Sequence, residues 1–240
     1  MENISTKTVR EIALETPATV RVFEEFNIDY CCGGRKPLDV ACREAGVDSQ
    51  VVSDRVNAVI AGTPDDDGGE RPEGKQPTEL VNYILAKHHI FTAAELERLQ
   101  PLMEKVATRH GENHPELLDL KNVLGTLTDS LKLHMMKEEN ILFPYIQSLD
   151  ESVRSGASAP TPHFGTVLNP IRMMEADHDT DGERLRYMRE ITKGYTLPEG
   201  ACPSFTALYA GLEDLEKDLH RHIHLENNVL FPAAAELEGS

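Results

Sequence analysis

The sequence contains one eleven-residue segment twice, and each copy pairs a histidine with a glutamate four residues later. The first copy runs from His134 to Pro144 and the second from His222 to Pro232, with His, Glu, Asn, Leu, Phe and Pro at matching places. Residues four apart lie on the same face of a helix, so each pair can direct an imidazole nitrogen and a carboxylate to one point. A single pair of this kind is usually a weak surface ion pair, but it also has the geometry of a metal-binding pair.

Apolar residues that step by three and four lead into both pairs and place them on the buried side of their helices. An ionised carboxylate on a buried stripe costs several kcal/mol of desolvation unless it is paired or bound to a metal. Glu138 and Glu226 occupy equivalent places on two such stripes, so the sequence predicts a positively charged partner for both. The stripes are Leu117, Leu120, Leu124, Leu127 and Leu131 before His134, and Phe205, Leu208, Leu212, Leu215 and Leu219 before His222.

Two other helical stripes carry one histidine each. His89 lies 45 residues before His134. His178 likewise lies 44 residues before His222. This spacing predicts a duplicated helical hairpin, with a histidine on the first helix and the His-x-x-x-Glu pair on the second. Two such hairpins form a four-helix bundle in which four histidines and two glutamates converge, as in dinuclear carboxylate sites. His88 is the main competitor of His89 for its position.

The types of the predicted ligands indicate which metal the bundle holds. Imidazole and carboxylate ligands suit iron, manganese or zinc, and the absence of cysteines from these stripes disfavours a structural zinc or an iron–sulfur cluster. Iron is our first choice. Two iron ions can be bridged by the two carboxylates while each ion keeps two histidines. The predicted ligands are His89, His134, Glu138, His178, His222 and Glu226.

Composition and charge exclude several other classes of function. The chain has 240 residues, of which 40% are hydrophobic, and a formal net charge of −17. This charge disfavours nucleic acid as a partner, because affinity for phosphate backbones comes chiefly from clustered Lys and Arg. No apolar run approaches the ~18 residues of a membrane helix, and the first residues do not form a signal peptide, so we expect a cytoplasmic protein without a membrane partner. The cysteines are then reduced thiols, and Cys42 and Cys202 are expected to be structural.

The order of helix signals predicts an all-α chain in two parts. Residues 1–61 are predicted to form a small helical domain, and residues 78–240 the bundle. Between them, residues 62–77 are polar, rich in Gly and Pro, and expected to be a flexible linker across which the parts meet by docking. In the first part, the expected helices run from Thr6 to Leu14, from Pro17 onward, from Pro37 to Ala45 and from Val51 to Ile60. In the second part, they run over 78–109, from Pro115 to Phe143-Pro144, over 170–193, and from Pro203 to Leu230 before Phe231-Pro232.

Cys31 and Cys32 also have chemistry of their own, in a turn formed by residues 27–36. The Cα atoms of adjacent residues are about 3.8 Å apart, below the usual range for a disulfide, so we interpret the pair as acting together on another group. Arg35, Lys36 and the start of the following helix would favour thiolates. The alternative is a pair of buried apolar thiols in a tight turn.

These motifs resemble those of a known family. The segment from Phe26 to Gly34, with its Ile-Asp-Tyr-Cys-Cys-Gly-Gly sequence, resembles the short N-terminal domain of the iron–sulfur cluster repair di-iron proteins. The second part resembles their hemerythrin-like domain, and the resemblance covers almost the full length. The segments that carry it in the second part are His134 to Pro144, Glu175 to Asp179, and His222 to Pro232.

The resemblance implies a stress-response protein that restores iron–sulfur clusters damaged by nitric oxide or peroxide, by supplying iron. It implies the same six metal ligands, two iron ions as cofactor, with Glu138 and Glu226 bridging them, and damaged iron–sulfur proteins as clients. On this hypothesis, Cys31 and Cys32 would receive iron or dock on the client as a thiolate pair.

Two features depart from the family pattern, and other functions stay open. The connection 147–169 is longer than the family pattern needs, and Asp181 adds a carboxylate one turn beyond His178. One alternative is an enzyme that reduces NO to N₂O at the two ions. Another is a protein that binds NO or O₂ reversibly, with oxygen carriage the least favoured because the predicted site is symmetric. A homodimer that brings the Cys-Cys turn of one chain to the site of another is also compatible with the linker.

Overall fold

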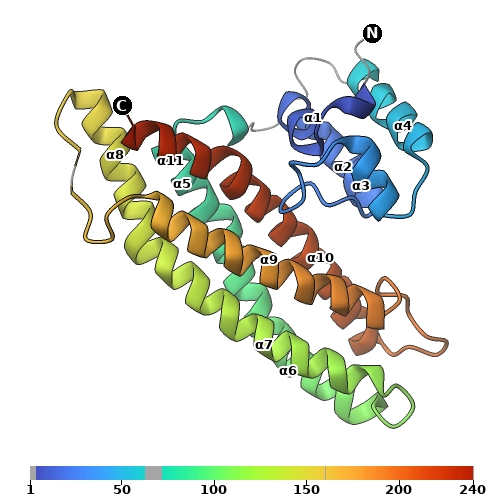
Figure 1. The fold of residues 1–240 in the computed structure, drawn as a ribbon. Coiled ribbons are helices and arrows are strands. Elements are labelled where there is room, and N and C mark those ends of the chain that lie inside the picture. Colours follow the sequence, from blue (N-terminus) through green and yellow to red (C-terminus); the bar gives the residue numbers. More distant parts are fainter. Residues whose placement is uncertain (1–3, 63–71, 160, 240) are drawn as a thin grey trace.

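The computed structural model describes residues 4–62, 72–159 and 161–239, and these residues form helices and no β-strand. Figure 1 shows a cluster of short helices beside a long helical bundle. The all-α architecture predicted from the sequence is confirmed. Residues 63–71 of the predicted linker 62–77 lie outside the described residues, whereas Gly62 belongs to the preceding helix.

The N-terminal part has its own start signal and its own core. Its first α-helix begins after Thr8 and not after Thr6 as predicted, because the Thr8 hydroxyl accepts from the N–H of Glu11 while the Glu11 carboxylate accepts from the N–H of Thr8. Phe23 and Leu38 are fully buried in an apolar cluster that shares no residue with the described clusters of the bundle. The α-helices of this part are α1 (Val9–Glu15), α2 (Val20–Glu25), α3 (Leu38–Glu44) and α4 (Ser49–Gly62).

The bundle consists of two helical hairpins with π-helical turns inside their helices. The first hairpin is formed by α5 (Pro77–Ile84), the π turn η4 (Leu85–His89) and α6 (Ile90–His110), followed by α7 (Glu116–Lys137), the π turn η5 (Glu138–Leu142) and α8 (Phe143–Ser155). The second is formed by α9 (Leu168–Ile191), followed by α10 (Pro203–Leu225), the π turn η6 (Glu226–Leu230) and α11 (Phe231–Glu238).

The predicted helix ends at Phe143-Pro144 and Phe231-Pro232 are wrong, because the chain continues as α8 and α11. A π turn precedes each of them: the N–H of Phe143 donates to the carbonyl of Glu138, and that of Phe231 to the carbonyl of Glu226. In an α-helix a proline ring clashes with the carbonyl four residues earlier, and proline has no N–H to donate. The wider π turn relieves this conflict, so the prolines shift the helix without ending it.

The connection between the hairpins is shorter than predicted. Helix α8 takes up residues 147–155 of the predicted connection 147–169, because Ile146 and Leu149 are fully buried in a cluster that also contains residues of α5. Gly156, at φ 69°, ends the helix in the left-handed region that glycine adopts most easily. Among the described helices, none has both the length and the apolar character needed to cross a bilayer.

Two apolar clusters fill the bundle, with a polar layer between them. On α10, Leu219 belongs to one cluster and Leu225 to the other. On α9, Leu185 and Met174 are divided in the same way. The predicted leucine stripes are therefore core, and the polar residues between them are enclosed from both ends of the bundle.

Candidate metal centre

The six side chains predicted as ligands meet in this polar layer. They form two groups that share both glutamates, and in each group one nitrogen or oxygen per residue lies within 4.8 Å of the others. Each of the six residues is at most 4% exposed. Position A is the group of His89, His222, Glu138 and Glu226, and position B is the group of His134, His178, Glu138 and Glu226.

Each glutamate divides its two oxygens between the positions. One oxygen of Glu138 lies 3.4 Å from Nε2 of His89, and the other lies 3.2 Å from Nε2 of His134. The two oxygens of Glu226 lie 3.0 Å and 3.1 Å from the Nε2 atoms of the remaining histidines of positions A and B. This is the arrangement that a carboxylate needs in order to bridge two cations.

The π turns position three of these residues. His89 ends η4, Glu138 begins η5 and Glu226 begins η6. A π turn holds one residue more than an α turn, and such turns recur at functional sites. The extra residue changes the phase of each helix at the level of the site. The polar residues and the apolar residues beyond them therefore both face the interior.

The imidazoles keep both glutamates ionised. Burial and the second carboxylate raise the pKa of Glu138, but His134 and His89 outweigh them and hold it below its ordinary value. Burial also opposes ionisation of Glu226, yet His222 and its neighbours bring this pKa well below the ordinary range. Two carboxylates thus stay negatively charged where almost no water reaches them.

Unpaired buried atoms indicate that the residues fit a cation. Both oxygens of Glu138 and Nε2 of His89 have no hydrogen-bond partner among the described residues. A buried polar atom left in this state costs about 1–3 kcal/mol, and a metal ion at each position removes that cost. Imidazole and carboxylate together match the ligand preferences of iron, manganese and zinc.

The residue after each glutamate contacts a histidine from outside the site. Nδ1 of His89 lies 2.8 Å from Oε1 of Glu139, and Nδ1 of His178 lies 2.8 Å from Oδ1 of Asn227. Such partners fix the ring orientation and direct the other nitrogen toward the metal. Our reasoning from the sequence missed Glu139 and Asn227, although their equivalent places in the duplicated segment were a signal.

His88 does not belong to either group. Its Nδ1 lies 3.0 Å from a carboxylate oxygen of Asp218, and its ring stacks on that of His222 with centroids 5.5 Å apart. The structure therefore brings His89, and not its competitor, to the glutamates. His88 is nevertheless buried, so it supports a ring of position A and does not face solvent.

Asp181, the additional carboxylate on α9, is buried but belongs to neither group. It forms an ion pair with Arg184, and the hydroxyl of Ser130 donates to it at 3.3 Å. Burial raises the pKa of Asp181 although both partners act in the opposite direction. Asp181, which departs from the family pattern, thus forms an internal ion pair beside the site and is not a member of it.

The turn of residues 27–36 docks onto η6. The side-chain amide of Asn228 donates to the backbone carbonyls of Tyr30, at 3.2 Å, and Cys31, at 3.4 Å. In return, the guanidinium of Arg10 donates to the backbone carbonyl of Asn228 at 2.8 Å. The two parts of the chain therefore meet at a π turn that begins with a site residue, through docking as predicted.

This docking also buries His224, which lies off the helix stripe and was expected to face solvent or to support a ligand from outside the site. Nδ1 of His224 lies 3.3 Å from the carbonyl of Tyr30 and 3.0 Å from the amide of Asn228. Burial lowers the pKa of His224 to about 4. A neutral imidazole therefore lies in the contact between the parts at neutral pH.

The two cysteines of the docked turn share one carboxylate through their backbone N–H groups. Their Sγ atoms are 3.9 Å apart, and Asp29 accepts from the backbone N–H of Cys31 and of Cys32 at 3.0 Å. The contact with Cys32, burial and the charge of Asp29 raise the pKa of Cys31 well above its ordinary value. Cys31 is therefore a thiol at neutral pH.

The expectation that Arg35 and Lys36 favour thiolates is wrong for Cys31. Both basic side chains are engaged elsewhere: Arg35 pairs with Glu175 of α9 at 3.2 Å, and Lys36 pairs with Glu44 at 2.6 Å. Their charges compensate carboxylates, and the nearest charge to the Cys31 sulfur is negative.

The other cysteines lie away from this turn. Cys42 is buried in the core of the N-terminal part, in agreement with a structural role. Cys202 is half-buried at the start of α10, with its sulfur 3.2 Å from Nε2 of His110.

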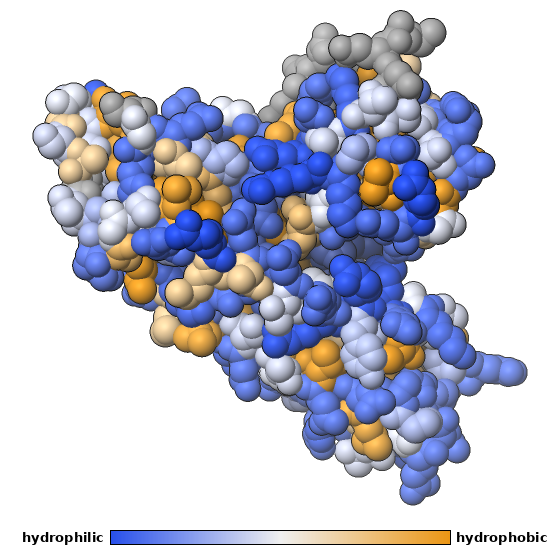
Figure 2. Space-filling view, viewed as in Figure 1, coloured by the Kyte–Doolittle hydropathy of each residue, from blue (hydrophilic) through white to orange (hydrophobic). Residues whose placement is uncertain are grey.

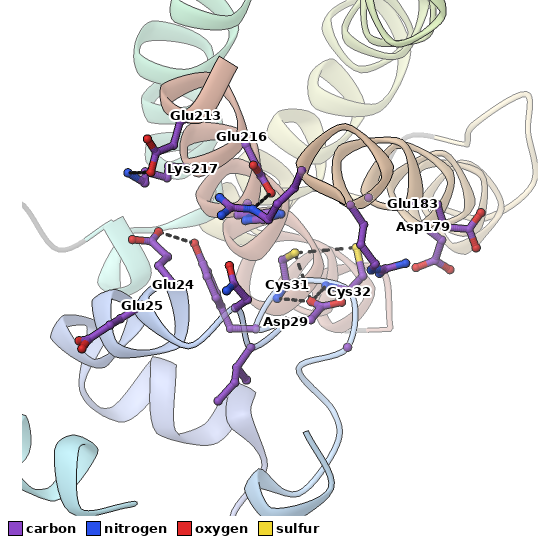
Figure 3. Close-up of a pocket in the computed structure, with 18 of the residues that line it drawn as sticks. Glu24, Glu25, Asp29, Cys31, Cys32, Asp179, Glu183, Glu213, Glu216 and Lys217 are labelled. Carbon is purple, nitrogen blue, oxygen red and sulfur yellow. Dashed lines mark hydrogen bonds and ion pairs between the residues drawn. The ribbon is translucent and has the colours of Figure 1, made fainter. Parts of the chain in front are cut away.

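A cleft of about 740 Å³ separates the N-terminal part from α9 and α10, and both thiols line it. Figure 3 shows Cys31 and Cys32 beside Asp29, with Asp179 and Glu183 of α9 across from them. Figure 2 shows the hollow between the two parts and the largely hydrophilic surface around it. A small molecule or an ion can therefore approach the thiols without crossing the bundle.

Alkylation should distinguish Cys31 from an exposed thiol. We expect iodoacetamide to modify Cys31 of the metal-free protein at least about tenfold more slowly than a free thiol at pH 7, because only the thiolate reacts. The rate should rise with pH beyond the ordinary thiol range. Timed alkylation with peptide mass spectrometry measures this. Cys32→Ala, which removes the largest cause of the raised pKa, should react faster at Cys31, and equal rates in the two proteins would contradict the assignment.

Both parts of the chain match known protein families. Residues 80–234 match the hemerythrin HHE cation binding domain, and residues 5–60 match a domain of unknown function, DUF542. The iron–sulfur cluster repair protein YtfE of Yersinia pseudotuberculosis serotype IB (strain PB1/+) is 34% identical over 224 residues, which cover 93% of this chain and 94% of that protein. The chain belongs to the hemerythrin-like family of iron–sulfur cluster repair proteins. The protein of the same name from Yersinia pestis (strain Pestoides F) has the same identity and coverage.

Membership of the repair family confirms the resemblance drawn from the motifs. The residues matched by the hemerythrin domain include all six residues of positions A and B. Those matched by DUF542 include Cys31 and Cys32. The repair-family architecture therefore combines a cation-binding bundle with a thiol-bearing N-terminal part.

Proposed function

We propose that the chain holds two iron ions at positions A and B and uses them to repair damaged iron–sulfur clusters in the cytoplasm. The observation that carries the proposal is the division of each carboxylate between the positions, with one oxygen of Glu138 toward His89 and the other toward His134. Family membership supports the repair role, since the similar Yersinia proteins are named for it.

The ligand set suits storage that ends in release. Bound iron supplies a centre that changes between the ferrous and ferric states. The protein contributes two carboxylates and four imidazoles, which neutralise only half the charge of two ferrous ions in a site with almost no water. Glu138 and Glu226 belong to both positions and would each contact both ions, so loss of either carboxylate contact would loosen both. A damaged cluster that lacks iron is the client that such a site can serve.

The thiol pair has a place in this function. Cys31 and Cys32 line the cleft, and their turn is fixed to η6 beside Glu226. We propose that they receive iron or contact the client. A Cys31→Ala/Cys32→Ala protein should keep its bound iron and lose repair; full repair of an oxidised client by this variant would remove the thiols from the proposal.

The decisive experiment measures iron and repair in the same preparations. Wild-type protein should hold about two coupled irons per chain by elemental analysis and Mössbauer spectroscopy, and Glu138→Ala and Glu226→Ala should each lose them. The loaded wild-type protein should reactivate an enzyme whose iron–sulfur cluster has been damaged by NO or peroxide. Two bound irons without reactivation, but with N₂O formed from NO and an electron donor, would replace repair by NO reduction. Zinc, or one iron indifferent to both substitutions, would overturn the two-iron site itself.

A further inference from the structure

The duplicated segments differ in the residue that supports a histidine from outside the site. Glu139 and Asn227 follow the two shared glutamates, and each lies 2.8 Å from Nδ1 of a histidine: His89 of position A or His178 of position B. Both accept a hydrogen bond from the ring. A carboxylate raises the basicity of the imidazole and strengthens its bond to metal more than a neutral amide does.

The two supporting residues also differ in exposure. The side chain of Glu139 is 47% exposed, whereas Asn227 is 8% exposed. The N-terminal part covers η6 through Asn228 and leaves the equivalent residue Asn140 of η5 exposed. Figure 1 shows the N-terminal part beside α10 and not beside α7. The exposed carboxylate of Glu139 therefore links solvent to His89 of position A, on the side of the bundle that the N-terminal part does not cover.

A second carboxylate among the outer partners, that of Asp177, is already paired with a lysine. Asp177 lies 3.7 Å from Nδ1 of His134 at position B, but Lys137 pairs with it at 2.9 Å. No lysine or arginine pairs with Glu139 in the part of the chain that the structure describes. Glu139 is thus the uncompensated negative charge among these outer partners.

We propose that Glu139 is a positioning residue that makes the two metal positions unequal, so that position A depends on an exposed carboxylate and position B does not. The inference rests on the proposed two-iron function and deepens it. Iron at position A would be held by His89, whose supporting carboxylate solvent and clients can reach. The two ions would then be given up separately, and the ion at position A would leave first once Glu139 no longer supports His89.

The test compares Glu139→Gln with Asp177→Asn in protein loaded anaerobically with ferrous iron. In Glu139→Gln, one of the two irons should be removed by a ferrous chelator about 10- to 100-fold faster than in wild type, because loss of such an outer partner lowers metal affinity by about that factor and we expect the loss to fall on the release rate. In the Mössbauer spectrum of Glu139→Gln, the signal of that iron should change and the signal of the other iron should not. Asp177→Asn should show no selective change, and Glu139→Asp should lie closer to wild type than Glu139→Gln.

The outcomes separate this inference from the proposed function. Suppose that wild type holds two irons. The role of Glu139 would be overturned if both irons changed alike in Glu139→Gln, if neither changed, or if Asp177→Asn had an equal effect. The two-iron site would remain intact in each of these cases. Fewer than two irons in wild type would instead overturn the proposed function. Because Glu139 is exposed, the metal-free Glu139→Gln variant should have the same melting temperature as the metal-free wild type. A lower melting temperature of the variant would mean that Glu139 has a structural role.

Discussion

Removing the metal from the loaded protein is expected to lower its free energy of unfolding by about 5 kcal/mol. Each position contributes about 2.7 kcal/mol when free metal is at about 100 times its Kd, and the two contributions add because unfolding destroys both positions. Metal removal also leaves the oxygens of Glu138 and Nε2 of His89 buried without a hydrogen bond. Urea unfolding with and without a chelator, followed by circular dichroism, measures the difference.

The control for this prediction is a protein that cannot hold metal. Glu138→Gln/Glu226→Gln removes both shared charges and keeps the shape of the side chains. Its unfolding should not respond to added iron or to chelator. If wild-type protein were equally indifferent, the convergence of the six side chains would be an internal network of imidazoles and carboxylates with no resident ion.

Replacing Asn228 by alanine is expected to release the N-terminal part from the bundle. The carbonyl of Cys31 loses the donor that the side-chain amide supplies, and that of Tyr30 keeps only Nδ1 of His224 as a neighbour. A buried carbonyl without a donor costs about 1–3 kcal/mol, and this cost weakens the contact between the two parts. Backbone amides of residues 27–36 should exchange hydrogen much faster, as measured by mass spectrometry, while iron content stays the same.

Asn140 offers the matched substitution for this second prediction. It occupies the equivalent place in the duplicated segment, but it is exposed and donates to the carbonyl of Met136 in its own helix. Asn140→Ala should therefore leave exchange in residues 27–36 unchanged. Similar exchange in the two variants would mean that other contacts, such as that of Arg10, hold the parts together.

The positions of the site residues were predictable because two of them, His134 and Glu138, continue the apolar stripe of a single helix. The stripe that ends in His134 and Glu138 is continuous with buried leucines, and the copy at His222 and Glu226 repeats it. Periodicity then identified His89 and His178 on the facing helices. The leucine stripes form the core because the same spacing that buries them also buries the polar residues next in line.

The π turns were not predictable, because the prolines that follow two of them are also the usual signal of a helix end. Pro144 and Pro232 suggested helix ends, and only the packing of α8 and α11 onto the rest of the bundle makes continuation more stable. The state of the thiols was missed for a similar reason. The sequence places Arg35 near Cys31, but the structure provides Glu175, far away in the chain, as a better partner for the guanidinium.

The division of the bundle core into two apolar clusters has a consequence for cooperativity. A polar layer interrupts the contacts that would otherwise make the bundle unfold as one unit. Without metal, each end can open and close with its own free energy, and the end that contains α5, α8 and α11 can fray while the other stays closed. Metal ions held by residues from all four sides of the layer would join the two ends into one cooperative unit. On the proposed function, giving up iron would therefore also change how the protein unfolds, and a chain without iron would be easier for a protease to recognise than a loaded one.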